Sequence, residues 1–412
     1  MVYVRTALSL VFALTGLAAQ AEDWPQFRGP TGQGHSTERN LPLAWSESKN
    51  VAWKALVAGR GWSSPVVVGG RVWLTSAVRE RDGASLRVLA YDADSGREAV
   101  NVELFRLRDA KLMNPKNSHV SPTPIADGDR VYVHFGAEGT AAVTTSGAIL
   151  WKTRIPFVNQ HGGGGSPVLY EDLLIFNCDG WDAAFVVALD ARTGKMRWKT
   201  NRRYPADQAY TTPLIIRVGE QDQVVSVGAY RAAAYEPRSG REIWRVSYRD
   251  GFSNVPRPVY GYGLVYIATG FQQPSLIAVR ADGTGDVTRT HTVWTQQRAA
   301  PLTPSPLLVD DVLYTVSDIG IVAALDARTG VPLWMQRLGG NYSASPVFAD
   351  GRIYFQSEEG LTTVIAPGKE FRVLARNQLE GETLASLAVS DGSIFIRTES
   401  YLYRIGSSSP QR

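Results

Sequence analysis

An internal repeat that recurs eight times is the feature that most limits what this 412-residue chain can form. Each copy opens with a short strand, turns tightly and returns as a second strand that contains aromatic residues. Seven copies begin at a proline and the eighth has a leucine in that place: Pro65, Pro124, Pro167, Pro213, Pro258, Pro306, Pro346 and Leu387. Successive copies start 40 to 59 residues apart, and this period is typical of propeller blades.

A second turn follows later in each copy, and its best examples are Ala188–Gly194 and Ala324–Gly330. The Asp of this turn can bond its own backbone, and the Gly can adopt a positive φ. A tryptophan stands four residues after the glycine in four copies, where it begins the outermost of four strands, named A to D. We expect these tryptophans, with Trp53, to pack between blades as structural residues: Trp151, Trp198, Trp244 and Trp334.

The two ends of the repeat region predict how the ring closes. The last copy supplies only three strands, and residues 51–56 form one strand without a partner in the sequence. We therefore predict an all-β, eight-bladed propeller of four-stranded antiparallel blades over 51–405, closed by pairing the N-terminal strand with the C-terminal blade. Residues 22–50 are expected to form an extended cap across the ring, and 406–412 a tail. No sustained 3.6-residue apolar period predicts a helix after the first 21 residues.

The first 21 residues have the pattern of a cleavable secretion signal. Arg5 precedes an apolar run over 7–17, and Ala19-Gln20-Ala21 is an A-x-A cleavage site. The run is shorter than the ~20 residues that a membrane span needs. We expect cleavage after Ala21 and a periplasmic or secreted protein with no membrane span.

Composition excludes several classes of site. A single cysteine, Cys178, rules out an internal disulfide framework and cysteine-based metal sites. A net charge of +4 is too small to predict nucleic-acid binding. No catalytic residue and no metal ligand set is predicted, and a monomer is expected.

The unit Ala-x-Asp-x-x-Thr-Gly-x-x-x-Trp at 188–198 and 324–334 resembles the tryptophan-docking signature of the pyrroloquinoline quinone (PQQ)-like repeat propellers. The resemblance covers nearly all of 51–405. The segment 23–30, Asp-Trp-Pro-Gln-Phe-Arg-Gly-Pro, resembles an exported bacterial group of this type whose function is undetermined. Related branches are the quinoprotein alcohol dehydrogenases, which bind PQQ and calcium, and the outer-membrane assembly lipoprotein, which is a scaffold. This chain lacks the adjacent cysteine pair found in many of those dehydrogenases and the lipidated N-terminal cysteine of that lipoprotein.

The links from strand D to the next strand A, and from B to C, should share one face of the ring around its central opening. They carry flat aromatic and planar cationic side chains, which suit a protein partner or a small polar or acidic ligand. The candidate binding residues are Arg60, Trp62, His119, His161, Asp179, Trp181, Tyr210, Arg257, Arg298 and Tyr342.

These link residues leave alternatives open. His119 and His161 could form a metal pair, although loop histidines are more often solvated. Gly162–Gly165 could cradle an anion, or could fit a narrow channel mouth. Asp179 and Asp182 flank Trp181 and could act as an acid and a base, or could be solvated turn residues.

The sequence thus favours an exported, non-catalytic binding or assembly scaffold without a cofactor. The alternative is a PQQ-dependent dehydrogenase that uses calcium at the same face. Replacing Trp62 or Arg257 with alanine should weaken binding by about 1–2 kcal/mol and leave folding nearly intact, as expected for interface anchors.

Overall fold

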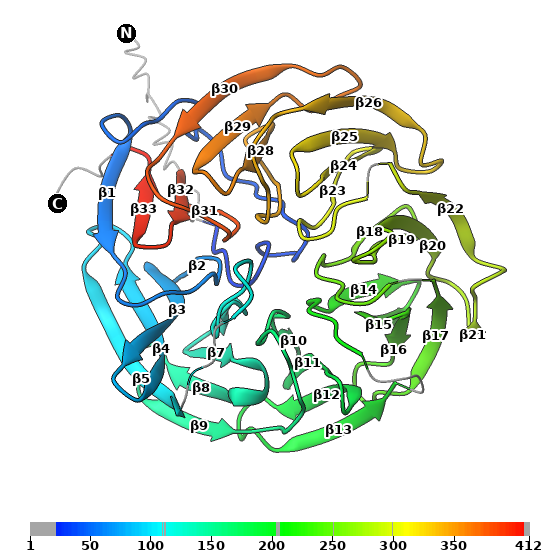
Figure 1. Ribbon diagram of the computed structural model, residues 1–412, viewed down its shortest axis with the longest axis horizontal. Helices are drawn as coiled ribbons and strands as arrows, with labels where there is room; N and C mark the ends of the chain where they lie inside the picture. The colour runs from blue at the N-terminus through cyan, green and yellow to red at the C-terminus, as the bar shows by residue number, and fades with distance from the viewer. Residues whose placement is uncertain are drawn as a thin grey trace, which may run out of the picture.

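The computed structural model describes residues 22–108, 110, 113–202, 207–249, 251–298 and 300–407. The expected secretion signal at 1–21 lies outside these residues. Eight β-sheets are arranged in a ring (Figure 1). This confirms the predicted all-β, eight-bladed propeller. The described residues contain no α-helix, only a 3₁₀ turn, η1, at Gly136–Glu138.

Each blade has four antiparallel strands in the order A to D from the centre outward. Blade 1 contains β2 (Val66–Val68), β3 (Arg71–Glu80), β4 (Gly83–Asp92) and β5 (Glu98–Arg108), and blade 2 contains β6 (Ile125–Asp127), β7 (Arg130–His134), β8 (Thr140–Thr144) and β9 (Ile149–Thr153). Blade 3 contains β10 (Val168–Tyr170), β11 (Leu173–Asp179), β12 (Ala184–Asp190) and β13 (Met196–Asn201). Blade 4 contains β14 (Leu214–Val218), β15 (Gln221–Gly228), β16 (Arg231–Tyr235) and β17 (Glu242–Ser247).

Blades 5 to 7 repeat this arrangement. Blade 5 contains β18 (Val259–Gly261), β19 (Leu264–Thr269), β20 (Ser275–Arg280) and β22 (Thr292–Gln296). Blade 6 contains β23 (Leu307–Val309), β24 (Val312–Val316), β25 (Ile321–Asp326) and β26 (Pro332–Arg337). Blade 7 contains β27 (Val347–Ala349), β28 (Arg352–Gln356), β29 (Leu361–Ile365) and β30 (Val373–Gln378). A short extra strand, β21 (Gly285–Asp286), pairs in parallel with β17 on the outside of blade 4.

Blade 8 is built from both ends of the described chain. It contains β31 (Ala388–Ser390), β32 (Ser393–Arg397), β33 (Tyr401–Ile405) and, as its outer strand, β1 (Val51–Leu56). In the antiparallel register Trp53 lies opposite Arg404 and Leu56 opposite Tyr401. The predicted closure of the ring is therefore confirmed, and this pairing covers the edge that β33 would otherwise present.

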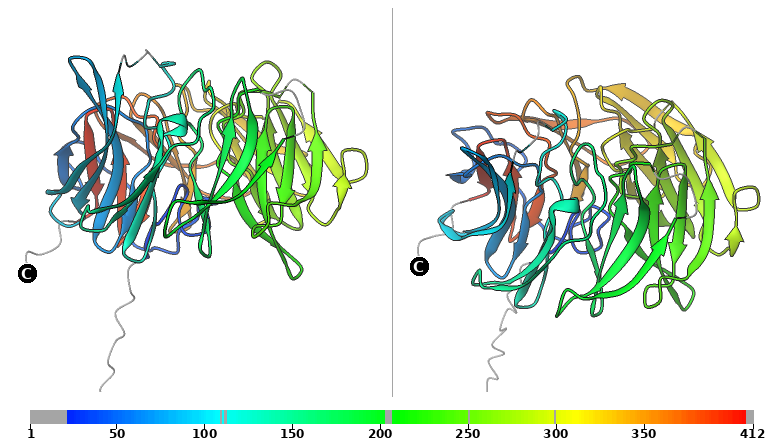
Figure 2. Two further views of the ribbon diagram at one scale, coloured as in Figure 1. Left: turned by 90° about the horizontal axis from the view of Figure 1, so that it is seen from below. Right: turned by 60° about the horizontal axis from the view of Figure 1, so that its bottom comes forward.

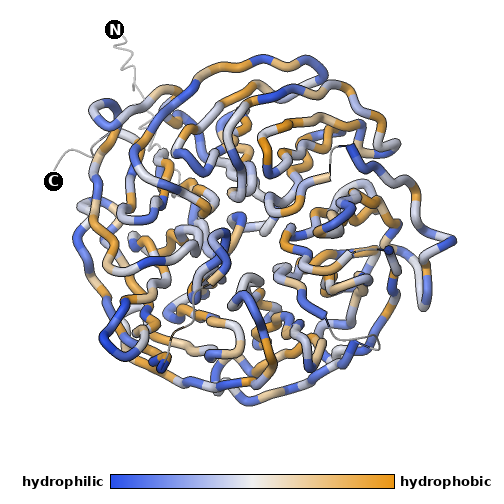
Figure 3. The backbone as a smooth tube through the Cα atoms, in the orientation of Figure 1, coloured by the Kyte–Doolittle hydropathy of each residue, from blue (hydrophilic) through white to orange (hydrophobic). Residues whose placement is uncertain are grey.

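The hydrophobic core lies between the blades. One core cluster joins strands of blades 1, 7 and 8 to Trp24, Leu41 and Trp45 of the N-terminal segment. Hydrophobic residues are concentrated within the blades in Figure 3, whereas many turns and links are hydrophilic. A single blade has two apolar faces, so each blade needs both of its neighbours to bury them.

Indole N–H groups connect neighbouring blades. Five tryptophans on D strands donate to a carbonyl in the C-to-D turn of the next blade: Trp53 to Ala93, Trp151 to Ala191, Trp198 to Pro237, Trp294 to Ala327 and Trp334 to Gly368. Trp244 differs from the sequence expectation because it donates to Gln223 of its own blade. Trp294 was missed because the C-to-D link of blade 5 is longer and includes β21, so the four-residue spacing from a glycine fails there.

A ring of hydrogen bonds surrounds the centre at the residue before each repeat proline. This residue is Ser or Thr in seven blades and Arg257 in blade 5. Seven backbone N–H groups donate to the hydroxyl of the next blade: Ser64 to Thr123, Thr123 to Ser166, Ser166 to Thr212, Arg257 to Ser305, Ser305 to Ser345, Ser345 to Ser386 and Ser386 to Ser64. These bonds satisfy backbone donors where the strands converge and link one blade to the next.

Residues 22–36 run through the centre of the ring against several inner strands. Trp24 forms a bridge with Val67 of blade 1, and His35 forms one with Phe348 of blade 7. The His35 ring also bonds to the carbonyl of Leu308 in blade 6, at 2.7 Å. Figures 1 and 2 show this dark-blue segment at the centre, toward the side of the disc away from the link that follows β5. We call residues 22–36 the plug.

Candidate functional site

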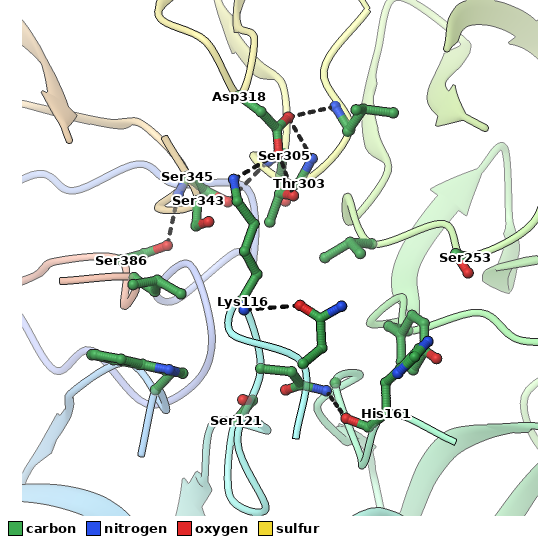
Figure 4. A pocket seen from close by; sticks show the side chains of 18 of the residues that line it. Lys116, Ser121, His161, Ser253, Thr303, Ser305, Asp318, Ser343, Ser345 and Ser386 are labelled. Atoms are coloured by element: carbon green, nitrogen blue, oxygen red, sulfur yellow. Dashed lines mark hydrogen bonds and ion pairs between the residues drawn. The ribbon is translucent and has the colours of Figure 1, made fainter. Parts of the chain in front are cut away.

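A central cavity of about 480 Å³ lies on the face that carries the D-to-A and B-to-C links (Figure 4). Phe27 of the plug lines it, so the plug lies beneath the opening that the links surround. Its apolar lining residues come from the plug and several blades: Phe27, Trp62, Tyr210, Phe252, Val255, Phe271, Leu302 and Leu384.

The polar part of the cavity lining is mostly hydroxyl groups. Six members of the hydrogen-bonded ring contribute to it: Ser64, Thr123, Ser166, Ser305, Ser345 and Ser386. Each of these hydroxyl oxygens accepts a hydrogen bond from a backbone N–H group. The O–H group of each can still donate a hydrogen bond to a ligand. The cavity therefore combines flat apolar surface with neutral hydrogen-bonding groups.

The link between blades 1 and 2 crosses the cavity, and we call its residues 113–119 the strap. An Asn-Pro turn shapes its tip, where Lys116 N–H donates to Asn114 Oδ1 at 2.9 Å and Asn117 N–H to the Asn114 carbonyl at 2.8 Å. Asn117 Nδ2 donates to the His161 carbonyl at 2.5 Å. These bonds hold the strap against blade 3 and direct Lys116 across the opening (Figure 4).

Lys116 forms ion pairs with carboxylates on the far side of the ring. Its Nζ lies 3.0 Å from Glu358 Oε1 in blade 7 and 3.4 Å from Asp318 Oδ1 in blade 6. Burial by itself would lower the pKa of the Lys116 ammonium. Glu358 and Asp318 together have a larger effect in the opposite direction, so the pKa of Lys116 is raised. Lys116 and Asp318 are the two residues with formal charges among those described that line the cavity.

Three of the candidate binding residues line this cavity, namely Trp62, His161 and Tyr210. The His161 and Tyr210 rings lie 6.4 Å apart, and burial raises the pKa of the Tyr210 hydroxyl. Arg60 lies over the Trp62 ring at 5.7 Å and is held at the rim by Glu382 and Glu399.

Three further candidates, His119, Trp181 and Arg298, are not among the described residues that line the central cavity. His119 and Trp181 line a second, more polar hollow of about 640 Å³ that is formed by links of blades 1 to 3. His119 and His161 thus face different hollows. Arg298 is exposed after β22, and its backbone N–H donates to Gln296 Oε1 at 3.0 Å.

Arg257 corrects the sequence-based picture of an exposed anchor. It is 2% exposed, and its guanidinium donates to the carbonyls of Pro213 at 2.9 Å and Phe27 at 2.7 Å. A further contact reaches Gln26 Oε1 at 3.4 Å. Arg257 joins the plug to the wall of the channel, so we expect its loss to destabilise the fold instead of leaving it nearly intact.

Asp179 and Tyr342 are also buried instead of facing a ligand. Strand β11 continues to Asp179, so this residue belongs to the blade, where its carboxylate accepts from Arg202 Nε at 2.8 Å. Burial raises the pKa of the Asp179 carboxyl, and Arg202 opposes that shift. Tyr342 packs in the core between blades 6 and 7. Spacing in the sequence did not show that β11 extends as far as Asp179. It also did not show that the link containing Tyr342 turns into the core.

The structure brings in residues that the site prediction omitted, above all Lys116, Asp318, Phe252 and Phe271. The rings of Phe252 and Phe271 are 6.1 Å apart at the cavity edge. The extra length of the first repeat step marked the strap, but nothing in the sequence indicated that its lysine would reach blades 6 and 7.

Large apolar side chains are exposed on the links around the cavity face. They are 51–61% exposed and come from blades 3, 5 and 6: Val158, Trp181, Phe271 and Ile319. Phe271 lines the central cavity, whereas Val158 and Trp181 line the second hollow, and exposed apolar groups beside a hollow are typical of interaction sites.

The described part of the chain contains no group of three or more His, Cys, Asp or Glu side chains arranged to hold a metal ion. Within the described ranges, no helix has the length and apolar character needed to cross a bilayer.

A family model described as "Outer membrane protein assembly factor BamB" matches this sequence over residues 35–200, 114–229 and 286–370. A comparison with the curated proteins found no match.

Similar solved structures include both scaffold and enzyme propellers. BamB from Moraxella catarrhalis has a TM-score of 0.56 and 14% identity, with 85% of this chain and 99% of that chain covered. A europium-containing methanol dehydrogenase has a TM-score of 0.67 and 11% identity, covering 92% and 90%. The quinohemoprotein alcohol dehydrogenase from Comamonas testosteroni has a TM-score of 0.65 and 10% identity, covering 95% and 81%. At these identities the likeness concerns the fold alone.

Proposed function

Because this chain belongs to the family described as outer membrane protein assembly factor BamB, we propose that it is an exported, non-catalytic propeller that binds a partner protein at its central cavity. The description of the family concerns assembly, a task that depends on contacts between proteins. Export rests on the signal pattern at 1–21.

The observation that carries this proposal is the cavity together with its apolar rim. Phe27 of the plug forms part of the lining, Trp62 and Phe252 form part of the wall, and Phe271 is 61% exposed at the edge. A partner can therefore insert a side chain into the hollow and cover the rim around it. Central apolar anchors surrounded by a polar edge are the usual source of binding energy at protein interfaces.

Two groups that could perform chemistry, Cys178 and Asp179, are buried away from the cavity, which supports a binding role. Cys178 is buried in the core of blade 3, and burial raises the pKa of its thiol well above the usual value, which keeps the thiol protonated. Asp179 is buried in an ion pair with Arg202. Neither residue lines the cavity.

The cavity residues do not fit PQQ, the cofactor of the alternative proposal. PQQ carries three carboxylates, and a site for it needs cations or a metal to balance them. The described lining of the cavity has one lysine, Lys116, and the two carboxylates beside it, Asp318 and Glu358, would repel the carboxylates of PQQ. Asp318 also accepts the backbone N–H groups of Leu302 and Thr303, at 3.0 and 3.1 Å. No step of a dehydrogenase mechanism is therefore assigned to this cavity.

Photocrosslinking in cells that produce the protein tests the proposal. A photoreactive phenylalanine analogue at position 271 should give a discrete crosslinked species with one partner protein. The matched control places the analogue at Tyr262, which is 45% exposed in an A-to-B turn on the opposite face, and should give none. Equal crosslinking from both positions, or none from either, would contradict a partner site at the cavity face.

A titration with PQQ tests the alternative. We expect neither a calorimetric nor an absorbance signal of binding at micromolar PQQ, with or without calcium, and no dye-linked alcohol oxidation. Micromolar uptake accompanied by turnover would replace the scaffold proposal with the enzyme.

A further inference from the structure

We infer that the cavity recognises a cationic group beside an aromatic or apolar one, and that Lys116 occupies the cation position when the partner is absent. The inference deepens the proposed function and rests on it. The occupant to which it commits is a segment of the partner protein in which a lysine or arginine lies next to an aromatic residue.

The first support is that two carboxylates are held in place by groups other than Lys116. Thr303 Oγ1 donates to Asp318 Oδ1 at 2.6 Å, and the backbone N–H groups of Leu302 and Thr303 donate to its Oδ2. Ser343 Oγ donates to Glu358 Oε1 at 2.6 Å. The two side chains are only 15% and 14% exposed. They would therefore remain in position if the lysine moved away, and the site would carry two negative charges.

The second support is that the ammonium group in this site comes from a distant part of the chain. Lys116 lies at the tip of the strap, 202 residues from Asp318 in sequence, and reaches across the cavity to it (Figure 4). Its side chain is 42% exposed. Partly exposed ion pairs contribute little net stability, so a ligand can displace this one at low cost.

The charges near the site favour a cation over an anion. Burial and the neighbouring carboxylates of Glu399 and Glu358 raise the pKa of Glu382. The positive charge of Arg60 acts in the opposite direction. Four carboxylates, those of Asp318, Glu358, Glu382 and Glu399, thus lie from the cavity to the edge of blade 8, where they pair with two cations, Lys116 and Arg60. This inference therefore differs from the sequence-based expectation of a small polar or acidic ligand.

The apolar wall supplies the second half of the recognition. Trp62, Leu302 and Leu384 line the same cavity as Asp318 and Lys116. A ligand whose amine binds the carboxylates can therefore place an aromatic ring against these side chains. Burial of that ring provides affinity, and the charge pair provides specificity.

The test uses Lys116→Ala in the chain that begins at Glu22 and three probes of equal size: 2-phenylethylamine, 2-phenylethanol and phenylacetate. Isothermal titration calorimetry should show that the variant binds the amine at least tenfold more tightly than either other probe. It should also bind the amine more tightly than the unaltered protein does, because the competing lysine is gone. Lys195→Ala, at an exposed C-to-D turn on the opposite face, is the matched control and should behave like the unaltered protein.

A second substitution assigns the preference to the carboxylates. Adding Glu358→Gln to Lys116→Ala should remove most of the preference for the amine while thermal melting stays cooperative. Equal binding of all three probes, no binding of the amine, or tighter binding of phenylacetate would each overturn the inference.

Two peptides test the protein source of the cation. A blocked Lys-Trp peptide should bind Lys116→Ala more tightly than a blocked Glu-Trp peptide, and the reverse order or equal binding would overturn a basic segment as the occupant. The two proposals fail separately. If a partner is crosslinked at position 271 but Lys116→Ala does not prefer the amine, only this inference is contradicted. If Lys116→Ala prefers the amine but no partner is crosslinked, only the proposed function is contradicted.

Discussion

At the scale of single residues, the buried guanidinium of Arg257 connects the plug to the wall of the channel. Arg257 occupies the place before a repeat proline that is Ser or Thr in the other seven blades, and its side chain turns inward to the plug. The sequence could show that Arg257 departs from its repeat. It could not show that the carbonyls of Pro213 and Phe27, which are 44 and 230 positions away, would accept hydrogen bonds from the guanidinium.

Replacing Arg257 with alanine should lower the free energy of unfolding by about 3 kcal/mol or more. The change removes hydrogen bonds from a charged donor and leaves the buried carbonyls of Pro213 and Phe27 without that partner. Urea unfolding of the variant measures the loss. Arg192→Ala, at an exposed turn, should change stability by less than about 0.5 kcal/mol, and equal effects of the two changes would show that Arg257 does not anchor the plug.

His134 should make the protein sensitive to mild acid. Its ring is buried beside Phe176, at 4.3 Å, and burial lowers its pKa from 6.5 to about 3. The folded state therefore binds fewer protons than the unfolded state below pH 6.5, so the stability present above that pH is lost as the pH falls toward 3. His134→Gln should remove about 2 kcal/mol of the stability difference between pH 7 and pH 4.5. Parallel pH dependences of unfolding in both proteins would contradict this assignment.

At the scale of the strands and turns, repetition made the sequence informative. The same turn pattern recurs, so each copy supports the strand boundaries of the others, and the blades follow the predicted four-strand order. The four-residue spacing to tryptophan failed where a blade departs from the repeat. In blade 5 the inserted β21 pairs with β17 and separates Trp294 from its turn in sequence, although the indole still donates to Ala327.

The C-to-D turn glycines should be less replaceable than their conformation alone requires. Gly330 has φ +71°, and a Cβ atom there would lie 2.6 Å from the Trp294 ring. Gly351 has φ +68°, and a Cβ there would meet nothing within 4 Å. Gly351→Ala should cost about 1–2 kcal/mol for its positive φ, and Gly330→Ala about 1–3 kcal/mol more because of the crowded ring. Chemical denaturation of the two variants gives the comparison, and equal losses would mean that the indole does not restrict the turn.

At the scale of the whole molecule, the eight copies and the two ends of the repeat region predicted the closed ring. The alternation of strand direction places all D-to-A and B-to-C links on one side, and the central cavity lies on that side. Which link residues reach the cavity depends on how each link bends, and that is set by contacts between blades. Trp62, His161 and Tyr210 do line the cavity, whereas the strap and its lysine required the assembled ring.

Two truncations should separate closure of the ring from filling of its channel. A chain that begins at Ala58 lacks β1 and exposes the edge of β33, so it should aggregate or lose cooperative unfolding. A chain that begins at Val51 keeps β1 but lacks Trp24, Phe27 and Trp45, so it should stay monomeric and unfold cooperatively at a lower temperature. Size-exclusion chromatography and calorimetry distinguish these outcomes. An Ala58 chain that melts like one starting at Glu22 would contradict the role of β1 in closure.

The pairing of Trp53 with Arg404 also sets a waiting time during synthesis. The two residues are 351 positions apart (404 minus 53), so the ribosome completes β1 long before its partner strand exists. At about 5–20 residues per second, β1 waits roughly 20–70 s. Throughout that interval the growing arc of blades has an open end and an unpaired apolar strand. A cell that makes this protein must therefore keep the nascent chain from associating with other chains until the last blade emerges.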